Sequence, residues 1–175
     1  MGKVQTIIRG LVLVGLFVVG GSGFPGIASA ANAPLGYQLM CLKTPAECKG
    51  GGAAKVSATK DVLAVLKSVN LKINRSIKPR YDVASTDVWN PNAKSGDCED
   101  YALAKRKALI KAGVPAGSLR LAHVKTRSGE GHAVLIVKTS KGDLVLDNLT
   151  DTIKPLIQSG LRVVSMAGAN PTKWN

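Results

Sequence analysis

The longest periodic pattern of apolar residues lies between Ser57 and Pro79. Apolar side chains recur there every three or four residues, which predicts an amphipathic helix with one buried face. The residues of this stripe are Val62, Leu66, Val69, Ile73 and Ile77. Asp61 lies in the first turn of the expected helix, where the helix dipole favours an anion. Residues 31–56, which precede this helix, contain two prolines and three consecutive glycines, so we expect an irregular arm.

A second helix is predicted over residues 98–111, a segment rich in Ala, Leu and Lys. Asp97 is a suitable N-cap for it, and Gly113 and Pro115 follow its end. Three strand-like runs come next, at residues 119–126, 133–139 and 144–149, and a fourth run at 161–165 could add another strand. The short connection at residues 140–142 makes a hairpin of the second and third runs. Helices followed by antiparallel strands indicate the α+β class.

The first 30 residues show the order of segments found in a secretory signal peptide. Lys3 and Arg9 precede an uncharged apolar stretch at residues 10–19, and Ala28-Ser29-Ala30 matches the small residues before a cleavage site. We expect cleavage after Ala30, which leaves residues 31–175 as one domain in the periplasm or outside the cell. The alternative is an uncleaved membrane anchor, for which the apolar stretch is short against the roughly 18 residues of a span.

The composition is that of a basic globular protein. The chain has 175 residues, 24 Lys and Arg against 11 Asp and Glu, and a formal net charge of +13. Its hydrophobic content of 45% excludes a wholly disordered chain. The basic residues are scattered and no nucleic-acid-binding motif occurs. We therefore expect a solvated basic surface or an acidic protein partner, and no nucleic acid.

The three cysteines divide into a close pair and a single residue. Cys41 and Cys48 lie seven residues apart in a turn-rich stretch, and in an exported protein such a pair is expected to form a disulfide bond. Cys98 is left over. In a secreted chain an odd cysteine indicates an intermolecular disulfide or a free thiol with a function, and a buried inert residue is the third alternative.

Cys98, His132 and Asp147 are the residues best placed for chemistry. Cys98 begins the second helix, whose N-terminus can stabilise a thiolate and lower the pKa of the thiol. His132 could accept the thiol proton, Asp147 could hold the imidazole in the useful tautomer, and backbone N–H groups could stabilise an oxyanion. Asn148 is an alternative partner for the imidazole. His123 lies on an alternating strand and is interpreted as structural.

The expected hairpin makes this arrangement a geometric hypothesis. If the loop has an even number of residues, position 134 lies opposite position 147 and position 132 lies opposite position 149. His132 and Asp147 then share one face of the sheet as diagonal neighbours. An odd loop would place the two side chains on opposite faces.

Three ordered motifs resemble those of the bacterial transglutaminase-like cysteine peptidases, the family that includes the LapG-type periplasmic adhesin proteases. The motifs are Gly96-Asp-Cys-Glu-Asp-Tyr-Ala102, Gly131-His-Ala-Val-Leu135 and Val145-Leu-Asp-Asn-Leu149. Further positions that fit are Asn70, Asn74, Trp89, Lys105 and Gly113-Val-Pro115, and the similarity runs from about Tyr37 to Trp174.

The resemblance implies a papain-like, transglutaminase-core fold in which the nucleophile begins a helix packed on an antiparallel sheet. It implies Cys98 as nucleophile, His132 as base and Asp147 as orienting acid. It also implies a cell-surface adhesin as the substrate and an inhibitory membrane receptor as a partner.

Acidic residues flank Cys98 closely, since three of the eleven acids lie within residues 97–100. Helix capping and the helix dipole are the simplest explanation. Carboxylates beside a thiolate should however raise the pKa of the thiol, and a bound cation would remove that conflict. The resemblance implies calcium dependence, with Asp97 and Glu99 at the positions of the ligands. Ca²⁺ takes about 6–8 oxygen ligands, more than these residues supply.

Three functions follow from these observations. The first is an exported cysteine peptidase that cleaves a protein substrate through an acyl-thioenzyme. The second is transglutaminase-type transfer of the same acyl group to an amine. The third is a non-enzymatic module that binds calcium or a partner. The complete set of Cys98, His132 and Asp147 favours an enzyme.

Overall fold

The structure, a computed structural model, describes Gly2 and residues 32–83 and 86–175. Apart from Gly2, the expected signal peptide at residues 1–30 lies outside the described residues. Among the described residues, no helix has the length and the apolar character needed to cross a bilayer.

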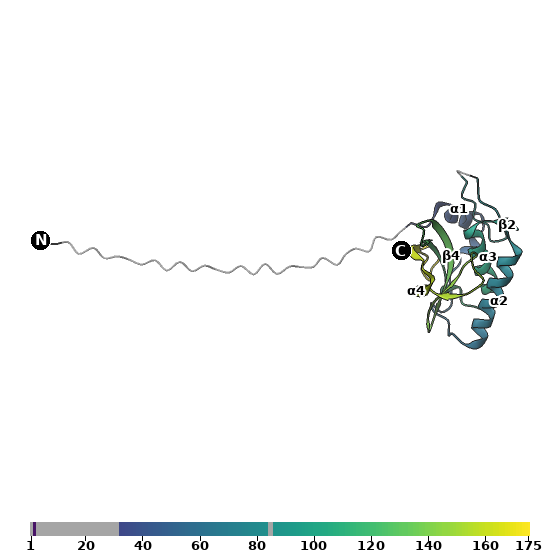
Figure 1. The fold of residues 1–175 in the computed structure, drawn as a ribbon. Coiled ribbons are helices and arrows are strands. Elements are labelled where there is room, and N and C mark those ends of the chain that lie inside the picture. Colours follow the sequence, from purple (N-terminus) through teal and green to yellow (C-terminus); the bar gives the residue numbers. More distant parts are fainter. Residues whose placement is uncertain (1, 3–31, 84–85) are drawn as a thin grey trace.

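A five-stranded antiparallel sheet in the order β6-β5-β4-β3-β7 forms the centre of the fold (Figure 1). The strands are β3 (Leu119–Lys125), β4 (Gly131–Thr139), β5 (Gly142–Leu146), β6 (Lys154–Pro155) and β7 (Arg162–Met166). The four expected strand-like runs correspond to β3, β4, β5 and β7. β5 ends three residues earlier than expected, at Leu146. The α+β fold class is thus confirmed.

The hairpin between β4 and β5 has the even connection that the hypothesis required. Thr139 pairs with Gly142 and Leu135 pairs with Leu146, so the loop consists of two residues. Continuing this register beyond Leu146 places position 147 opposite position 134. His132 and Asp147 therefore lie on the same face of the sheet.

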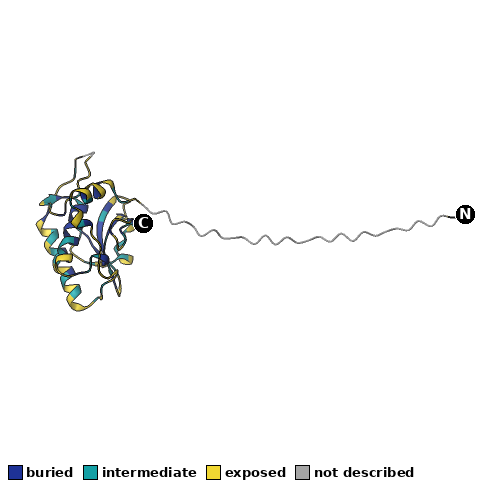
Figure 2. Ribbon diagram, turned by 180° about the vertical axis from the view of Figure 1, so that it is seen from behind, coloured by how far each residue is buried: buried dark blue, intermediate teal, exposed yellow. Residues whose placement is uncertain are grey.

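Two long helices are layered on one face of the sheet. Helix α3 (Cys98–Lys111) packs against β4, and α2 (Lys60–Ser76) packs on the outer side of α3 (Figure 1). The side chain of Thr59 caps α2 by accepting a hydrogen bond from the Val62 N–H. Because α3 is covered on both sides, most of its residues are buried (Figure 2).

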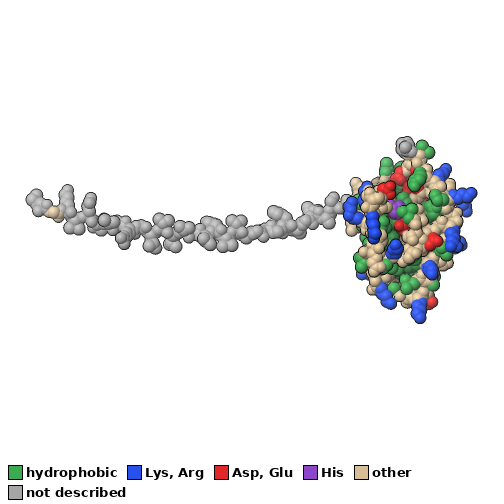
Figure 3. Space-filling model, viewed as in Figure 1, with side chains coloured by type: hydrophobic (Ala, Val, Ile, Leu, Met, Phe, Trp, Pro, Cys, Tyr) green, Lys and Arg blue, Asp and Glu red, His purple; other side chains and the backbone are tan. Residues whose placement is uncertain are grey.

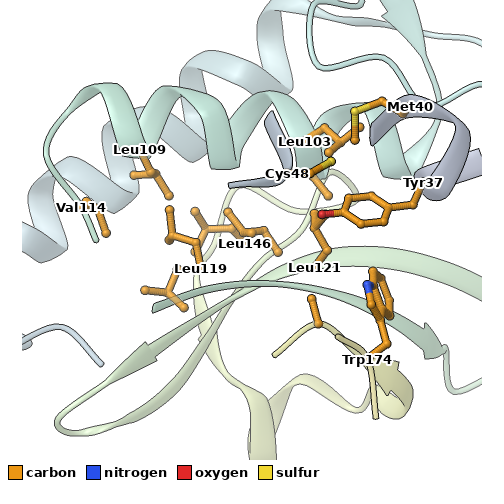
Figure 4. Packing of buried hydrophobic residues seen from close by; sticks show 14 of the residues in the cluster. Tyr37, Met40, Cys48, Leu103, Leu109, Val114, Leu119, Leu121, Leu146 and Trp174 are labelled. Atoms are coloured by element: carbon orange, nitrogen blue, oxygen red, sulfur yellow. The ribbon is translucent and has the colours of Figure 1, made fainter. Parts of the chain in front are cut away.

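Apolar side chains fill both faces of the sheet. Leu103 and Leu109 of α3 pack with Leu121 of β3 and Leu146 of β5 in the main core (Figure 4). On the opposite face a smaller cluster joins four strands of the sheet to α4 (Leu156–Ser159), and it includes Val124, Val134, Val145, Leu156 and Val163. Since successive strand residues point to opposite faces, the same strands supply both clusters.

The arm at residues 31–56 is more regular than the sequence predicts, and this is a correction. It contains α1 (Leu35–Lys43) and the 3-10 helix η1 (Pro45–Cys48). Tyr37 of α1 is buried, and its ring centroid lies 5.4 Å from that of Trp89 and 5.6 Å from that of Trp174. The prolines and glycines that indicated a loop flank these helices or lie at their first turns, where they are compatible with helix.

A disulfide bond joins Cys41 to Cys48, as the sequence indicated. The segment that it closes is bound to α3 through Arg106, whose side chain is almost fully buried. The guanidinium donates hydrogen bonds of 2.6 Å to the Glu47 carbonyl and 2.9 Å to the Lys49 carbonyl. The arm is thereby fixed to the helix that begins with Cys98.

A short parallel pair positions the chain just before that helix. β1 (Lys78–Pro79) follows α2, and it pairs with β2 (Ser95–Gly96). Gly96 is required there because a Cβ atom would overlap the Asp100 carboxylate. The pair ties the end of α2 to the turn that leads into Cys98.

Gly36 offers a test of how the arm packs. Its N–H donates to Asp87 Oδ2 over 3.2 Å, and a Cβ atom would overlap the Asp87 carbonyl and the Trp89 ring. We predict that Gly36→Ala lowers the free energy of unfolding by about 1–3 kcal/mol, because overpacking forces the loop to shift. Thermal denaturation measures the effect. Leu42→Ala on the exposed side of α1 is the control, and a Gly36→Ala protein as stable as the native one would contradict this packing.

Candidate active site

Cys98 is the first residue of α3 and is not part of a disulfide bond. Asp97 is the N-cap by backbone position, as expected, but its side chain does not cap the helix. Instead Asp97 Oδ2 accepts a hydrogen bond of 3.3 Å from the Asp82 N–H. Cys98 is half-buried, and the helix that it begins packs into the main core.

His132 and Asp147 meet at the ends of their strands. His132 is the second residue of β4, Asp147 follows the last residue of β5, and both side chains are largely buried. The imidazole Nε2 lies 2.8 Å from Asp147 Oδ1, which also accepts a 3.0 Å hydrogen bond from the Leu149 N–H. Burial alone would raise the pKa of Asp147, but the bonds from His132 and Leu149 outweigh it and the pKa is lowered.

This ionised carboxylate determines the tautomer of the imidazole. A carboxylate can only accept hydrogen bonds, so Nε2 of His132 must carry the proton that it shares with Asp147. In the neutral ring, Nδ1 is then unprotonated and free to accept a proton. The pair therefore has the arrangement of a base with its orienting acid.

Two asparagines of α2 hold the segment that carries Asp147. Asn74 Nδ2 donates to the Asp147 carbonyl over 3.1 Å and to Asp151 Oδ1 over 3.0 Å. Asn70, which is fully buried, donates to the Asp151 carbonyl over 3.1 Å. From the sequence, both asparagines were noted only as part of the family resemblance. Polar residues next to the buried stripe of an amphipathic helix could have indicated that these side chains bind another segment.

Cys98 and His132 together line two adjoining cavities. The larger, of about 640 Å³, is bordered by Arg80, Tyr81 and Leu149. The smaller, of about 340 Å³, is bordered by residues that include Pro34, Trp89, His123 and Ala133. On the face shown in Figure 3, acidic side chains lie beside a histidine, while Lys and Arg occur mostly around the edge. Because both cavities meet at Cys98, an extended chain could pass over the thiol and place residues in each cavity.

The remaining polar candidates lie at the walls of these cavities. His123, interpreted from the sequence as structural, is exposed and borders the smaller cavity. Asn148, the alternative partner of the imidazole, borders the larger cavity, and its Oδ1 is buried without a hydrogen-bond partner among the described residues. The carboxylate bound to His132 is that of Asp147.

The Cys98 thiol has a high pKa in this environment, which corrects the expectation that the helix N-terminus lowers it. Burial, together with the negative charge of Glu99, raises the pKa of Cys98 to about 12. The thiol donates to Glu99 Oε2 over 3.3 Å, a contact that favours its protonated form. Local burial and a neighbouring acid are therefore the largest influences on the pKa of this thiol.

Three carboxylates come together beside the thiol. One oxygen each from Asp82, Asp97 and Glu99 lies within 4.8 Å of the others, so the group could hold a metal ion. Asp97 Oδ1 is buried without a hydrogen-bond partner in the described part of the chain. Burial of the Glu99 carboxyl group, together with the neighbouring Asp97, raises the pKa of Glu99 to about 8. Carboxylate oxygens suit a hard divalent cation such as Ca²⁺. Asp97 and Glu99 were expected from the sequence, but Asp82 was not, because it lies 15 residues before Asp97 in a loop without a periodic pattern.

These carboxylates predict how stability depends on pH in the presence of a chelator. An acid with a raised pKa in the folded state stabilises the fold below its unfolded pKa and loses that contribution as pH rises through its folded pKa. Because the pKa of Glu99 rises from 4.5 to about 8, the chelated protein should lose melting temperature between pH 5 and pH 7. Glu99→Gln should reduce this loss, and Glu130→Gln, at an exposed site, should not. Equal pH dependence of the native protein and Glu99→Gln would contradict the prediction.

Comparison with known proteins shows to which family this sequence is related. The family model of the bacterial transglutaminase-like cysteine proteinases (BTLCP) matches residues 27–175. No curated protein matches the chain at a significant level.

Solved structures of LapG from Legionella pneumophila have a similar fold. The calcium-bound LapG is 27% identical with a TM-score of 0.57, and the match covers 66% of this chain and 68% of LapG. The EGTA-treated LapG is 30% identical with a TM-score of 0.55, and the match covers 65% of each chain. A third LapG structure is 28% identical with a TM-score of 0.56, over 66% of this chain and 68% of LapG. The family match over most of the chain, supported by the LapG-like fold, shows that the protein belongs to the bacterial transglutaminase-like cysteine proteinases and is a cysteine peptidase.

Proposed function

We propose that this peptidase is exported and cleaves a protein substrate with Cys98 as nucleophile, His132 as base and Asp147 as orienting acid. The observation that carries the proposal is the 2.8 Å contact between His132 and Asp147, in a cleft that a free cysteine shares. A cysteine, an imidazole and an orienting carboxylate are the parts that nucleophilic catalysis by a thiol requires.

The chemistry follows from the protonation states of these groups. Nδ1 of His132 takes the thiol proton, and the sulfur attacks the carbonyl carbon of the peptide, forming a C–S bond and an oxyanion. Backbone N–H groups at the start of α3 stabilise that oxyanion. The imidazolium then gives its proton to the leaving amine as the C–N bond breaks. Water, deprotonated by His132, hydrolyses the acyl-thioenzyme and restores the thiol.

The high pKa of the thiol is the obstacle to this sequence of steps, and it supports a role for calcium. Asp82, Asp97 and Glu99 would hold the ion, and the buried Asp97 Oδ1 without a partner suits a ligand. Bound Ca²⁺ would supply positive charge that offsets the carboxylates beside Cys98. The names of the Legionella LapG structures, calcium-bound and EGTA-treated, agree with this proposal.

The location and the partners of the enzyme are also proposals. The signal-peptide pattern of residues 1–30 supports export to the periplasm or beyond. The excess of Lys and Arg over Asp and Glu and the position of Arg80 at the larger cavity suit an acidic segment of a protein substrate. The family resemblance supports a cell-surface adhesin as that substrate and a membrane receptor as an inhibitory partner.

Comparison of protein N-termini in cells tests the proposed function. We expect new N-termini in cells that produce the native enzyme and none in cells with Cys98→Ala, because the acyl-thioenzyme cannot form. Asp147→Asn should lower kcat by roughly 10³–10⁴-fold, since an amide favours the wrong imidazole tautomer. Identical N-termini in native and Cys98→Ala cells would contradict a peptidase role for this site. Ammonia release from a glutamine peptide without chain cleavage would identify acyl transfer to amines instead.

Alkylation of Cys98 tests the calcium site. At pH 7 we expect Ca²⁺ to increase the rate at which iodoacetamide modifies Cys98 by about 10-fold or more, because a cation lowers the pKa of a neighbouring thiol. Asp82→Asn should weaken this response, since it removes a ligand charge without touching the nucleophile. Asp61→Asn, at an exposed acid on α2, is the matched control. If a chelator changes neither alkylation nor peptidase activity, calcium has no role here.

A further inference from the structure

Lys105 is a buried charged residue that the proposed chemistry does not use. It lies seven residues after Cys98, two turns along α3 and on the same side of the helix. Its side chain has no exposed surface, and Nζ has no hydrogen-bond partner among the described residues. Lysine is rarely buried completely unless another group compensates its charge. A helical side chain leans towards the N-terminus of its helix, which directs Lys105 towards the Cys98 end.

Lys105 Nζ forms no hydrogen bond with a described residue, and the charges that act on it over a longer distance are the carboxylates of Asp147 and Asp151, in the segment that carries the orienting acid. From α2, Asn70 and Asn74 bind the same segment through their Nδ2 atoms. The Oδ1 atoms of both asparagines are buried and accept no hydrogen bond from the described residues. The ammonium donors of Lys105 and the amide acceptors of both asparagines are thus buried and unpaired in the described part of the chain.

We propose that Lys105 is a positioning residue, whose buried positive charge attracts the carboxylates of the segment 147–151, so that Asp147 stays ionised and in place against His132. The inference rests on the proposed function, in which Asp147 orients His132. Lys105 touches neither the thiol nor the cavities that border it, so it acts through Asp147.

The charge of Lys105 gives the proposal a direction that can be measured. A positive charge lowers the pKa of a carboxyl group near it, so Lys105 favours the carboxylate of Asp147. The same charge would oppose a second proton on the imidazole that Asp147 binds. Burial lowers the pKa of Lys105 itself to about 7, although Asp147 and Asp151 oppose that shift, so Lys105 is charged in acidic solution.

Histidine titration by NMR tests the proposal directly, because the chain contains only two histidines. In the Cys98→Ala protein, Lys105→Met should raise the titration midpoint of His132 by roughly half a pH unit to one unit. The midpoint of the exposed His123 should not change. Lys111→Met, at an exposed position near the end of the same helix, is the matched control and should move neither midpoint.

Stability and kinetics separate positioning from a merely structural role. Methionine has a similar volume, and replacing a buried charge by an apolar group is often neutral or stabilising, so Lys105→Met should keep the native melting temperature or exceed it. In the active enzyme the same change should lower kcat by about 10-fold or more with little change in KM. A folded Lys105→Met protein with an unmoved His132 midpoint overturns the proposal, whatever its stability.

The charge of Lys105 can also be measured without replacing the residue. If Lys105→Met does not fold, the NMR signals of the Lys105 side chain in the Cys98→Ala protein decide the question. The ammonium form at pH 6 is expected, and an uncharged amine at that pH overturns the proposal. The titration in Cys98→Ala needs no turnover. If Lys105→Met shifts the His132 midpoint there, but the native protein cleaves no substrate, the proposed function is refuted and the role of Lys105 is retained.

Discussion

The hydrogen bond between His132 and Asp147 is the interaction on which the site depends, and it is a consequence of strand register. The first residues of β4, which include His132, do not pair with β5, because β5 ends at Leu146. Asp147 is the next residue after β5, so it lies beside this unpaired part of β4. Two loop residues fix the alignment of the strands. One inserted residue would turn the two side chains to opposite faces, because the period of a strand is two.

Helix α3 connects this pair to the nucleophile at the expense of several buried charges. Glu99, Lys105 and Arg106 are all buried in a single helix, an arrangement that costs stability unless each charge is compensated. Arg106 binds carbonyls of the disulfide-closed arm, Lys105 acts on the Asp147 segment, and Glu99 belongs to the acid cluster. The bonds of Arg106 and the packing of Leu103 and Leu109 in the main core thus fix where the first residue of the helix lies.

Much of the fold, and the meeting of His132 with Asp147 in the candidate site, could be predicted because they depend on local patterns. Apolar periodicity located α2, α3 and the strands, and the parity of the hairpin loop placed His132 beside Asp147. Asp82 was missed because its loop has no period and meets the nucleophile turn only in three dimensions. The flanking acids indicated from the sequence that the pKa of the Cys98 thiol is raised, but burial, the larger cause, cannot be read from spacing. The short helix α1 was hidden by Pro34 and Gly36 at its start.

The position of the neutral imidazole proton tests the central claim most directly. In ¹⁵N-labelled native protein above the titration range of histidine, NMR distinguishes a proton on Nε2 of His132 from one on Nδ1. The structure predicts the Nε2–H tautomer, with that proton shared with Asp147 and Nδ1 left to accept a proton from the Cys98 thiol. A His132 ring protonated on Nδ1 would contradict this account, because Asp147 would then not orient the base.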